Sequence, residues 1–198
     1  MKMKLYFFIV LLSVSIISCN NSQNSEKQTE LKNQVTQVIT YEEVNAAQQA
    51  WCDAVVQIAK LHAESGDYKA FAEHVLTDAY DYDNGKVFFK PTLTTGNQTF
   101  RMTKKGALSY FVGGDSEYPN DKGFGIKPWV KASYDNYGEG NDGIQLQGNI
   151  AITMGNVSFT DKDGNVVTVD KTWAFKKGDD GKIRIILHHS SLPYSEAK

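Results

Sequence analysis

Residues 156–190, NVSFTDKDGNVVTVDKTWAFKKGDDGKIRIILHHS, contain three runs of strand-forming side chains separated by two tight turns. Both turns, at residues 163–164 and 180–181, read Asp-Gly, a typical hairpin pair because glycine adopts a positive φ without steric cost. The pattern predicts three consecutive antiparallel strands, over residues 156–161, 166–176 and 182–190. The C-terminal part of the chain is therefore expected to form a sheet.

Helices are predicted ahead of this sheet. Thr40 followed by Glu43 fits a capping box, in which each side chain accepts the backbone N–H of the other residue. Apolar residues then recur at three- and four-residue steps as far as Gly66, which predicts an amphipathic helix. Two shorter helices are predicted further along the chain, over residues 67–79 and 103–113.

Further strands are predicted among and after these helices, over residues 86–93, 124–134 and 144–154. Pro91 interrupts the first of them, and proline within a sheet is confined to an edge strand or a bulge. Helices gathered towards the N-terminus and strands gathered towards the C-terminus indicate the α+β class. The expected architecture is a cone-shaped, curved antiparallel sheet whose concave face is covered by the N-terminal helices, with a pocket between the two.

The N-terminus has the features of a bacterial lipoprotein signal. Residues 1–18 read MKMKLYFFIVLLSVSIIS, in which two lysines precede an apolar stretch, and Cys19 follows. The apolar stretch is shorter than the span of about 20 residues that a membrane helix needs, so we expect a signal peptide and lipidation of Cys19. Residues 19–39 are poor in large apolar side chains and predict a flexible tether. We expect a single domain over residues 40–198, anchored by lipid in the bacterial cell envelope and facing the periplasm or the surface.

Composition excludes several kinds of site. A formal net charge of −2 argues against a nucleic-acid-binding protein that relies on basic residues to displace counterions. Two cysteines, one of them assigned to the lipid, supply neither a disulfide framework nor a four-cysteine zinc site. Neighbouring His188 and His189 point to opposite faces of a strand, so they do not share a metal ion. We therefore expect neither a metal cofactor nor a nucleic-acid partner.

The last predicted strand carries the densest group of polar residues. Strict alternation groups His189 and Ser191 with the apolar residues that precede them at every second position. It places His188 and Ser190 on the opposite face. The first face is apolar until it ends in an imidazole and a hydroxyl, which predicts that His189 and Ser191 line the pocket. The alternative is that His189 is a core histidine with satisfied hydrogen bonds and Ser191 a hydroxyl at a strand end.

Six short motifs occur in a fixed order along the domain. They are FKPT (89–92), FR-x-T (100–103), GALSYFVGG (106–114), YP-x-DKGF (118–124), KPW (127–129) and LHHSSLPY (187–194). In this order they resemble the iota-class carbonic anhydrases, and more narrowly the metal-free branch of that class. The domain of that branch is similar to the association domain of calcium/calmodulin-dependent protein kinase II and to nuclear transport factor 2-like cones. The resemblance covers about residues 40–195.

The resemblance implies a carbonic anhydrase, which reversibly hydrates CO2 to bicarbonate, working without a metal cofactor. The resemblance also implies that Thr92, Tyr110 and one His-Ser pair of the closing motif line the site. Alternation along the strand selects His189 and Ser191 as that pair, so these four residues are the expected catalytic positions. His188 and Ser190 are the other pair that fits the closing motif, and we assign them to substrate binding. Because this fold commonly pairs through the outer face of its sheet, a homodimer is expected by analogy.

The chemistry of CO2 hydration indicates what each group has to do. A metal-free site has to remove a proton from water while the oxygen attacks CO2. His189 is a candidate because histidine as a residue type titrates near neutral pH, whereas Tyr110 serves as a base only beside a cation that stabilises its phenolate. The sequence leaves open which group takes the proton. The apolar wall that receives CO2 is expected to consist of Phe88, Phe111 and Trp129.

Two other functions fit the same fold, because one fold can serve binding, assembly and several kinds of catalysis. The first is a lipoprotein that binds a small ligand or assembles with other chains without catalysis. The second is a metal-dependent lyase that uses the same pocket.

Overall fold

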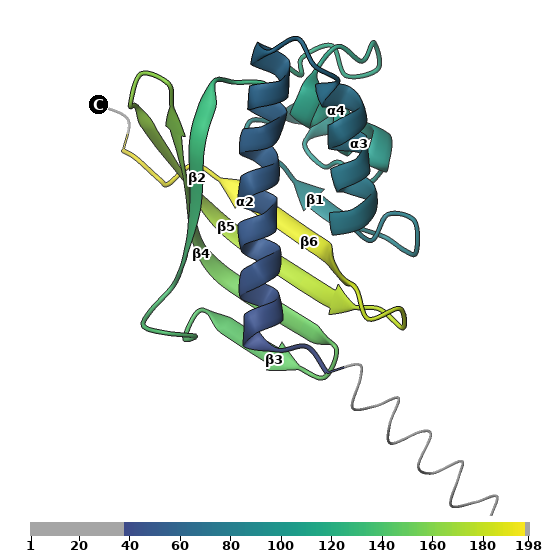
Figure 1. Cartoon of the computed structure of the whole chain (residues 1–198), viewed down its shortest axis with the longest axis vertical. Helices are drawn as coiled ribbons and strands as arrows, with labels where there is room; N and C mark the ends of the chain where they lie inside the picture. Colours follow the sequence, from purple (N-terminus) through teal and green to yellow (C-terminus); the bar gives the residue numbers. More distant parts are fainter. Residues whose placement is uncertain (1–37, 197–198) are drawn as a thin grey trace, which may run out of the picture. The chain divides into compact units, whose positions relative to one another are not determined.

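Residues 38–196, the part of the chain that the computed structural model describes, form three α-helices and a mixed sheet (Figure 1). They lie within one unit, Thr36–Lys198. The predicted signal at residues 1–18, the lipidation site Cys19 and all but the last two residues of the predicted tether lie outside the described residues. None of the helices within 38–196 is both long enough and apolar enough to cross a membrane.

The first helix, α2 (Tyr41–Ala63), begins where the sequence predicts it. Thr40 accepts a hydrogen bond from the Glu43 N–H at 3.2 Å, and Glu43 accepts one from the Thr40 N–H at 2.9 Å. The predicted capping box is therefore confirmed. The helix buries one stripe of side chains against the sheet, which includes Trp51 and Val55.

The two shorter helices also follow the predicted boundaries. Asp67 caps α3 (Tyr68–Ala79) and Thr103 caps α4 (Lys104–Val112), each side chain accepting a backbone N–H. α4 ends at Gly113, whose φ of 67° and ψ of −176° form a backbone conformation that only glycine adopts readily. In Figure 1, α2 crosses one face of the sheet, and α3 and α4 lie together beside it.

The strands of the described residues form one sheet in the order β1-β6-β5-β4-β2, with β3 paired to β4. They are β1 (Phe88–Lys90), β2 (Trp129–Asn136), β3 (Ile144–Gln147), β4 (Ile150–Asp161), β5 (Val166–Lys177) and β6 (Ile183–Ser191). Both predicted hairpins are present, and Gly164 and Gly181 in their turns have φ values of 84° and 75°. The predicted α+β fold, with helices on a curved sheet, is confirmed.

The sheet differs from the prediction in strand bounds and in pairing. β1 covers only Phe88–Lys90, and β2 begins at Trp129. The predicted strand 144–154 is divided at Gly148, where a φ of 60° turns the chain so that β3 pairs with β4, and β4 then runs unbroken past residue 155. β1 pairs with β6 in parallel, not antiparallel. The long connection between these two strands contains α4 and the rest of the sheet, and a parallel pair requires such a crossover. β1 is nevertheless the edge strand that Pro91 predicts.

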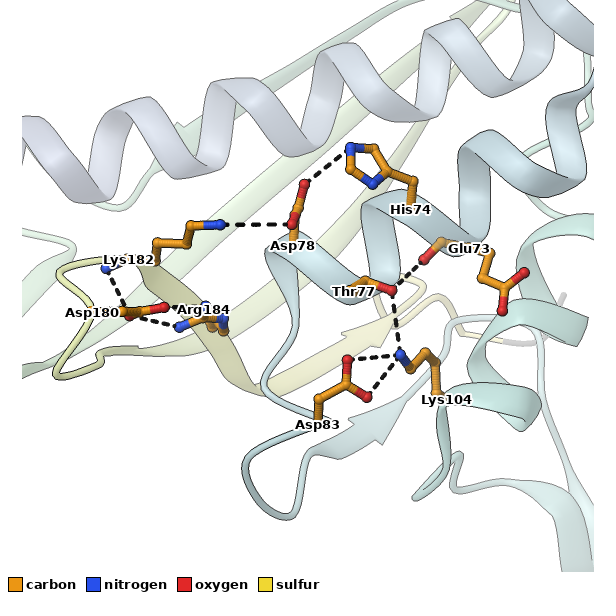
Figure 2. A network of polar contacts seen from close by, with 9 residues as sticks. All are labelled: Glu73, His74, Thr77, Asp78, Asp83, Lys104, Asp180, Lys182 and Arg184. Carbon is orange, nitrogen blue, oxygen red and sulfur yellow. Dashed lines mark hydrogen bonds and ion pairs between the residues drawn. The ribbon is translucent and has the colours of Figure 1, made fainter.

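A network of exposed polar side chains joins α3 to its neighbours (Figure 2). Lys104, at the start of α4, pairs with Asp83 at 2.7 Å. Asp78 pairs with His74 within α3 at 3.1 Å and reaches Lys182, beside the β5–β6 turn, at 4.0 Å. Exposed ion pairs contribute about 0–1 kcal/mol each. The network links α3 to the β5–β6 turn and adds little to the free energy of unfolding.

Candidate active site

A small cavity lies between α2, α4 and the strands β1, β5 and β6. Its volume is about 10 Å³, close to the least space that holds one water molecule. Aromatic side chains line it together with hydroxyl, imidazole and amine groups: Trp51, Phe89, Pro91, Thr92, Tyr110, Phe111, Phe124, Lys171, His188 and Ser190. The fold thus brings the predicted residues Thr92 and Tyr110 together, one from the segment after β1 and the other from α4.

The His-Ser pair that faces this cavity is His188 with Ser190, so the face predicted from alternation is wrong. Both of these side chains are 1% exposed. His189 is exposed on the outer face of β6, and Ser191 is not among the residues that line the cavity. The two residues that we assigned to catalysis on this strand therefore lie outside the site, and the two assigned to substrate binding lie within it.

A bulge in β6 is the physical reason for this correction. Ala174 of β5 pairs with Leu187, but the next residue, Phe175, pairs with Ile185, so Ile186 has no partner in the register. One extra residue in a strand shifts every following side chain to the other face. Ile185 faces the core as alternation predicts, and beyond the bulge it is the even-numbered positions that do so.

The first residue of the predicted apolar wall also lies outside the cavity. Phe88 is 56% exposed, and its neighbour Phe89 is 1% exposed and lines the site. The parallel pairing of β1 with β6 places Phe89 beside His188, and the two rings stack with their centroids 4.5 Å apart. Phe89 therefore occupies the position that we predicted for Phe88.

The other two predicted wall residues have different positions. Phe111 of α4 lines the cavity, as predicted. Trp129 lies behind Phe124, with ring centroids 5.6 Å apart, and its indole N–H donates to the Phe124 carbonyl at 2.8 Å. Trp129 supports the wall without reaching the cavity, and Phe124 is the lining residue in that place.

Three hydroxyl groups face the cavity. Thr92 Oγ1 and Ser190 Oγ are 2.5 Å apart, and either of them can be the donor. The Tyr110 hydroxyl is buried and makes no hydrogen bond of acceptable geometry within residues 38–196. Burial raises the pKa of Tyr110 to about 12, although the nearby Leu93 and Thr92 oppose that rise. A buried hydroxyl without a partner is costly, so this group is suited to a water or a substrate oxygen.

Lys171 lines the cavity and was missed in the sequence analysis. It lies on β5 in the same two-residue period as Val169, Trp173 and Phe175, all of which are buried. A charged residue at an inward position of an otherwise apolar strand face was the signal that could have revealed it. Lysine is rarely buried without a partner, and here the partner is His188.

A chain of hydrogen bonds runs from α2 to Lys171. The Trp51 indole N–H donates to Tyr80 Oη at 2.9 Å, and Tyr80 Oη is 2.8 Å from His188 Nδ1. His188 Nε2 is in turn 2.6 Å from Lys171 Nζ. All four side chains are buried.

Burial shifts the titration of both basic groups in this chain. It lowers the pKa of His188 well below its usual range, and the adjacent Lys171 lowers it further. Burial also lowers the pKa of Lys171 to about 7, with a small opposing influence from Cys52. His188 is therefore neutral at physiological pH, and Lys171 is the basic group of the cavity that titrates there.

The described residues offer no ligand set for a metal ion. Nowhere within 38–196 do three or more His, Cys, Asp or Glu side chains gather as they do around a bound ion. The donors of the cavity itself are hydroxyls, one neutral imidazole and one amine. The arrangement combines hydrogen-bond donors, an apolar wall and a base, which suits the addition of water to a small apolar electrophile.

Comparisons with known proteins agree on one family. The family model described as "Metal-independent carbonic anhydrase" matches residues 42–192. The chain is 51% identical, over 164 residues, to a metal-independent carbonic anhydrase of Nostoc sp. (strain PCC 7120 / SAG 25.82 / UTEX 2576), covering 82% of this chain and 78% of that one. It also matches the crystal structure of a cyanobacterial iota-carbonic anhydrase complexed with bicarbonate, at 51% identity and a TM-score of 0.77, covering 81% of this chain and 96% of that one.

Proposed function

The chain belongs to the metal-independent carbonic anhydrase family, and on that premise we propose that it hydrates CO2 to bicarbonate in the cavity between Thr92, Tyr110 and Ser190. The observation that carries the proposal is the buried Tyr110 hydroxyl, which makes no hydrogen bond of acceptable geometry among the described residues and borders a space the size of one water. A carbonic anhydrase needs a site for the attacking water and donors for the bicarbonate oxygens.

The hydroxyl groups act as donors to the oxygens of the product. Within the Thr92–Ser190 pair one hydroxyl donates to the other, which leaves the second proton free for a substrate oxygen. Tyr110 stays protonated at neutral pH because burial raises its pKa, so it donates a hydrogen bond and does not serve as the base. Donors held in place before the reaction stabilise the negative charge that grows on the CO2 oxygens.

His188 acts by holding its neighbours in position. Its two ring nitrogens are engaged by Tyr80 and Lys171, and its face is stacked on Phe89. A low pKa keeps the ring neutral, so it is a weak base at physiological pH. His189, the base that alternation suggested, is exposed on the outer face of the sheet and does not reach the cavity.

The aromatic side chains supply the apolar surface that CO2 needs. Phe89, Phe111 and Phe124 border the cavity beside the hydroxyl groups. The cavity has a volume of about 10 Å³, so the attacking water and CO2 together need more room than it offers. Such a wall and a few fixed donors are the usual composition of a small-molecule site.

A stopped-flow CO2 hydration assay on Thr92→Val, with Thr94→Val as the control, tests this site. Thr94 lies two residues away and bonds the Pro91 and Thr99 carbonyls outside the cavity. Loss of the Thr92 hydroxyl is expected to lower kcat/KM by about 10²-fold, the scale of one preorganised donor, and the control should match the wild type. Equal activities would place the chemistry elsewhere, and an inactive wild type with intact ligand binding would favour the non-catalytic function.

We also propose that the enzyme is anchored by lipid in the bacterial cell envelope. The support is the sequence of residues 1–18, with its basic start and apolar stretch, followed by Cys19. Metabolic labelling with a radioactive fatty acid should mark the wild type and not Cys19→Ala. A Cys19→Ala protein that still fractionates with membranes would refute the anchor.

A homodimer through the outer face of the sheet is proposed on the exposed apolar residues there. Phe88, Ile152 and Met154 are each more than two-fifths exposed on that face. Exposed apolar patches mark association surfaces. Sedimentation should give a dimer for the wild type and a monomer for Met154→Lys, whereas a wild-type monomer at high concentration would refute the proposal.

A further inference from the structure

Lys171 is unusual because its ammonium group has no counter-charge. The residue is 5% exposed, and none of the ion pairs formed within residues 38–196 includes it. Its Nζ lies 4.5 Å from the centre of the Trp51 ring and 5.5 Å from that of Trp173. Indole faces attract an ammonium, but removing an unpaired charge from water is costly. Burial is the larger effect, because the pKa of Lys171 is lowered.

Titratable groups from four parts of the fold surround this amine. They are His188 from β6, Cys52 from α2, Tyr110 from α4 and, through His188, Tyr80 from the end of α3. All four are neutral at pH 7. Burial raises the pKa of Cys52 to about 12, also raises the pKa of Tyr110 and of Tyr80, and lowers the pKa of His188. Asp135 and Asp170 border, with Lys171, an open groove on the other side of β5, and neither of them pairs with it.

The tautomer of His188 decides where the lone pair of the amine points. A neutral imidazole carries one proton, either on Nδ1 or on Nε2. With the proton on Nε2, His188 donates to Lys171 Nζ and occupies the only lone pair of the amine. With the proton on Nδ1, His188 donates to Tyr80 Oη, which also accepts from the Trp51 indole, and Nε2 accepts an N–H of Lys171. The second tautomer leaves the lone pair of the amine free for a proton.

Protonation of Lys171 keeps this second arrangement. An ammonium has no lone pair, so His188 Nε2 accepts from it and Nδ1 carries the imidazole proton. Nδ1–H donates to Tyr80, whose own proton has no acceptor among the described residues. His188 therefore holds the amine before the reaction and the ammonium after it without a change of tautomer.

We propose that the neutral Lys171 amine, held by His188, is the base that accepts the proton of the attacking water. The inference rests on the proposed function, because it assigns the proton in the same cavity. As the water oxygen bonds to carbon, one of its O–H bonds breaks and that proton forms an N–H bond with the Lys171 lone pair. The C=O π electrons move to the oxygen that faces the hydroxyl groups. The products are bicarbonate and an ammonium, and the ammonium returns its proton to the solvent buffer.

The titration of Lys171 is consistent with this assignment. Burial lowers its pKa to about 7, and a general base works best when its pKa is near the operating pH. Hydration activity should therefore rise with pH through an inflection near 7, where the amine becomes neutral.

The test compares Lys171→Met with Lys176→Met across this pH range. Methionine replaces the buried stem without an amine, and Lys176 is an exposed residue of the same strand. We expect Lys171→Met to lose about 10²- to 10⁴-fold in kcat/KM, the usual contribution of a general base, together with the inflection. Lys176→Met should keep both. A folded Lys171→Met that keeps the wild-type rate and profile would overturn the proposal.

A second measurement applies even if Lys171→Met fails to fold. Wild-type protein labelled with ¹³C at the lysine Cε carbons should give one NMR signal that titrates near 7, and a Lys171 signal that remains charged at pH 9 would overturn the proposal. If Thr92→Val is inactive while Lys171→Met is active, the proposed site stands and only the base is wrong. If the wild type does not hydrate CO2, the proposed function fails and the assignment of the base fails with it.

Discussion

Lys171→Met should make the protein more stable below neutral pH, while it removes activity. The folded state lowers the pKa of this lysine from 10.5 to about 7 because the side chain is buried. Between about pH 7 and pH 10.5, Lys171 is therefore protonated in the unfolded chain and neutral in the folded chain. The destabilisation is complete below pH 7, decreases as the pH rises, and is absent above the pKa of an ordinary lysine.

The magnitude follows from the two pKa values. A tenfold change in proton affinity corresponds to about 1.4 kcal/mol, so the lowered pKa amounts to about 5 kcal/mol at pH 6. The variant leaves His188 Nε2 without its hydrogen-bond partner, which costs about 1–3 kcal/mol. The proton linkage is the larger effect at pH 6, and the variant should gain about 2–4 kcal/mol there. At pH 9 about 2 kcal/mol of the linkage remains, and the two effects nearly cancel.

Urea unfolding of the wild type and the variant at both pH values measures this difference. The free energy of unfolding should favour Lys171→Met at pH 6 and be similar for the two proteins at pH 9. Lys176→Met, an exposed substitution on the same strand, should remain within about 0.5 kcal/mol of the wild type at both. A difference between wild type and Lys171→Met that does not change with pH would refute a lowered pKa at this site.

Three further outcomes follow from the contacts described above. Ser190→Ala should lower kcat/KM by about 10²-fold, whereas Ser191→Ala, outside the cavity, should match the wild type in the same assay. The opposite result would mean that the bulge in β6 is absent. Arg101→Met should lower the free energy of unfolding by about 3–5 kcal/mol, because the buried Asp121 carboxylate, 2.6 Å from the Arg101 guanidinium, would lose its counter-charge. A loss of less than about 1 kcal/mol in chemical denaturation would contradict this. Thr40→Ala should cost about 1 kcal/mol of unfolding free energy, the usual value of an N-cap, with no change in kcat/KM.

The sequence by itself determined the features that depend on neighbouring residues. The capping box of Thr40 and Glu43, the ends of the helices and the two Asp-Gly hairpins each involve residues only a few positions apart. Local sequence therefore contains all the information that they need. The motifs around Thr92 and Tyr110 identified the family before the positions of these side chains were known, because six short segments in a fixed order are specific even without coordinates.

Only the tertiary structure decided which side chains face the cavity. The bulge at Ile186 exists because β5 and β6 pair in two different registers on either side of it, and a strand read alone does not contain the register of its partner. The parallel pairing of β1 with β6 selects Phe89 over Phe88 in the same way. Lys171 became a candidate base only when β5, β6 and α2 came together around it, since its pKa depends on burial and on His188. Side-chain direction on a strand and proton affinity in a core are both set by contacts between distant residues, and such contacts form only when the chain folds.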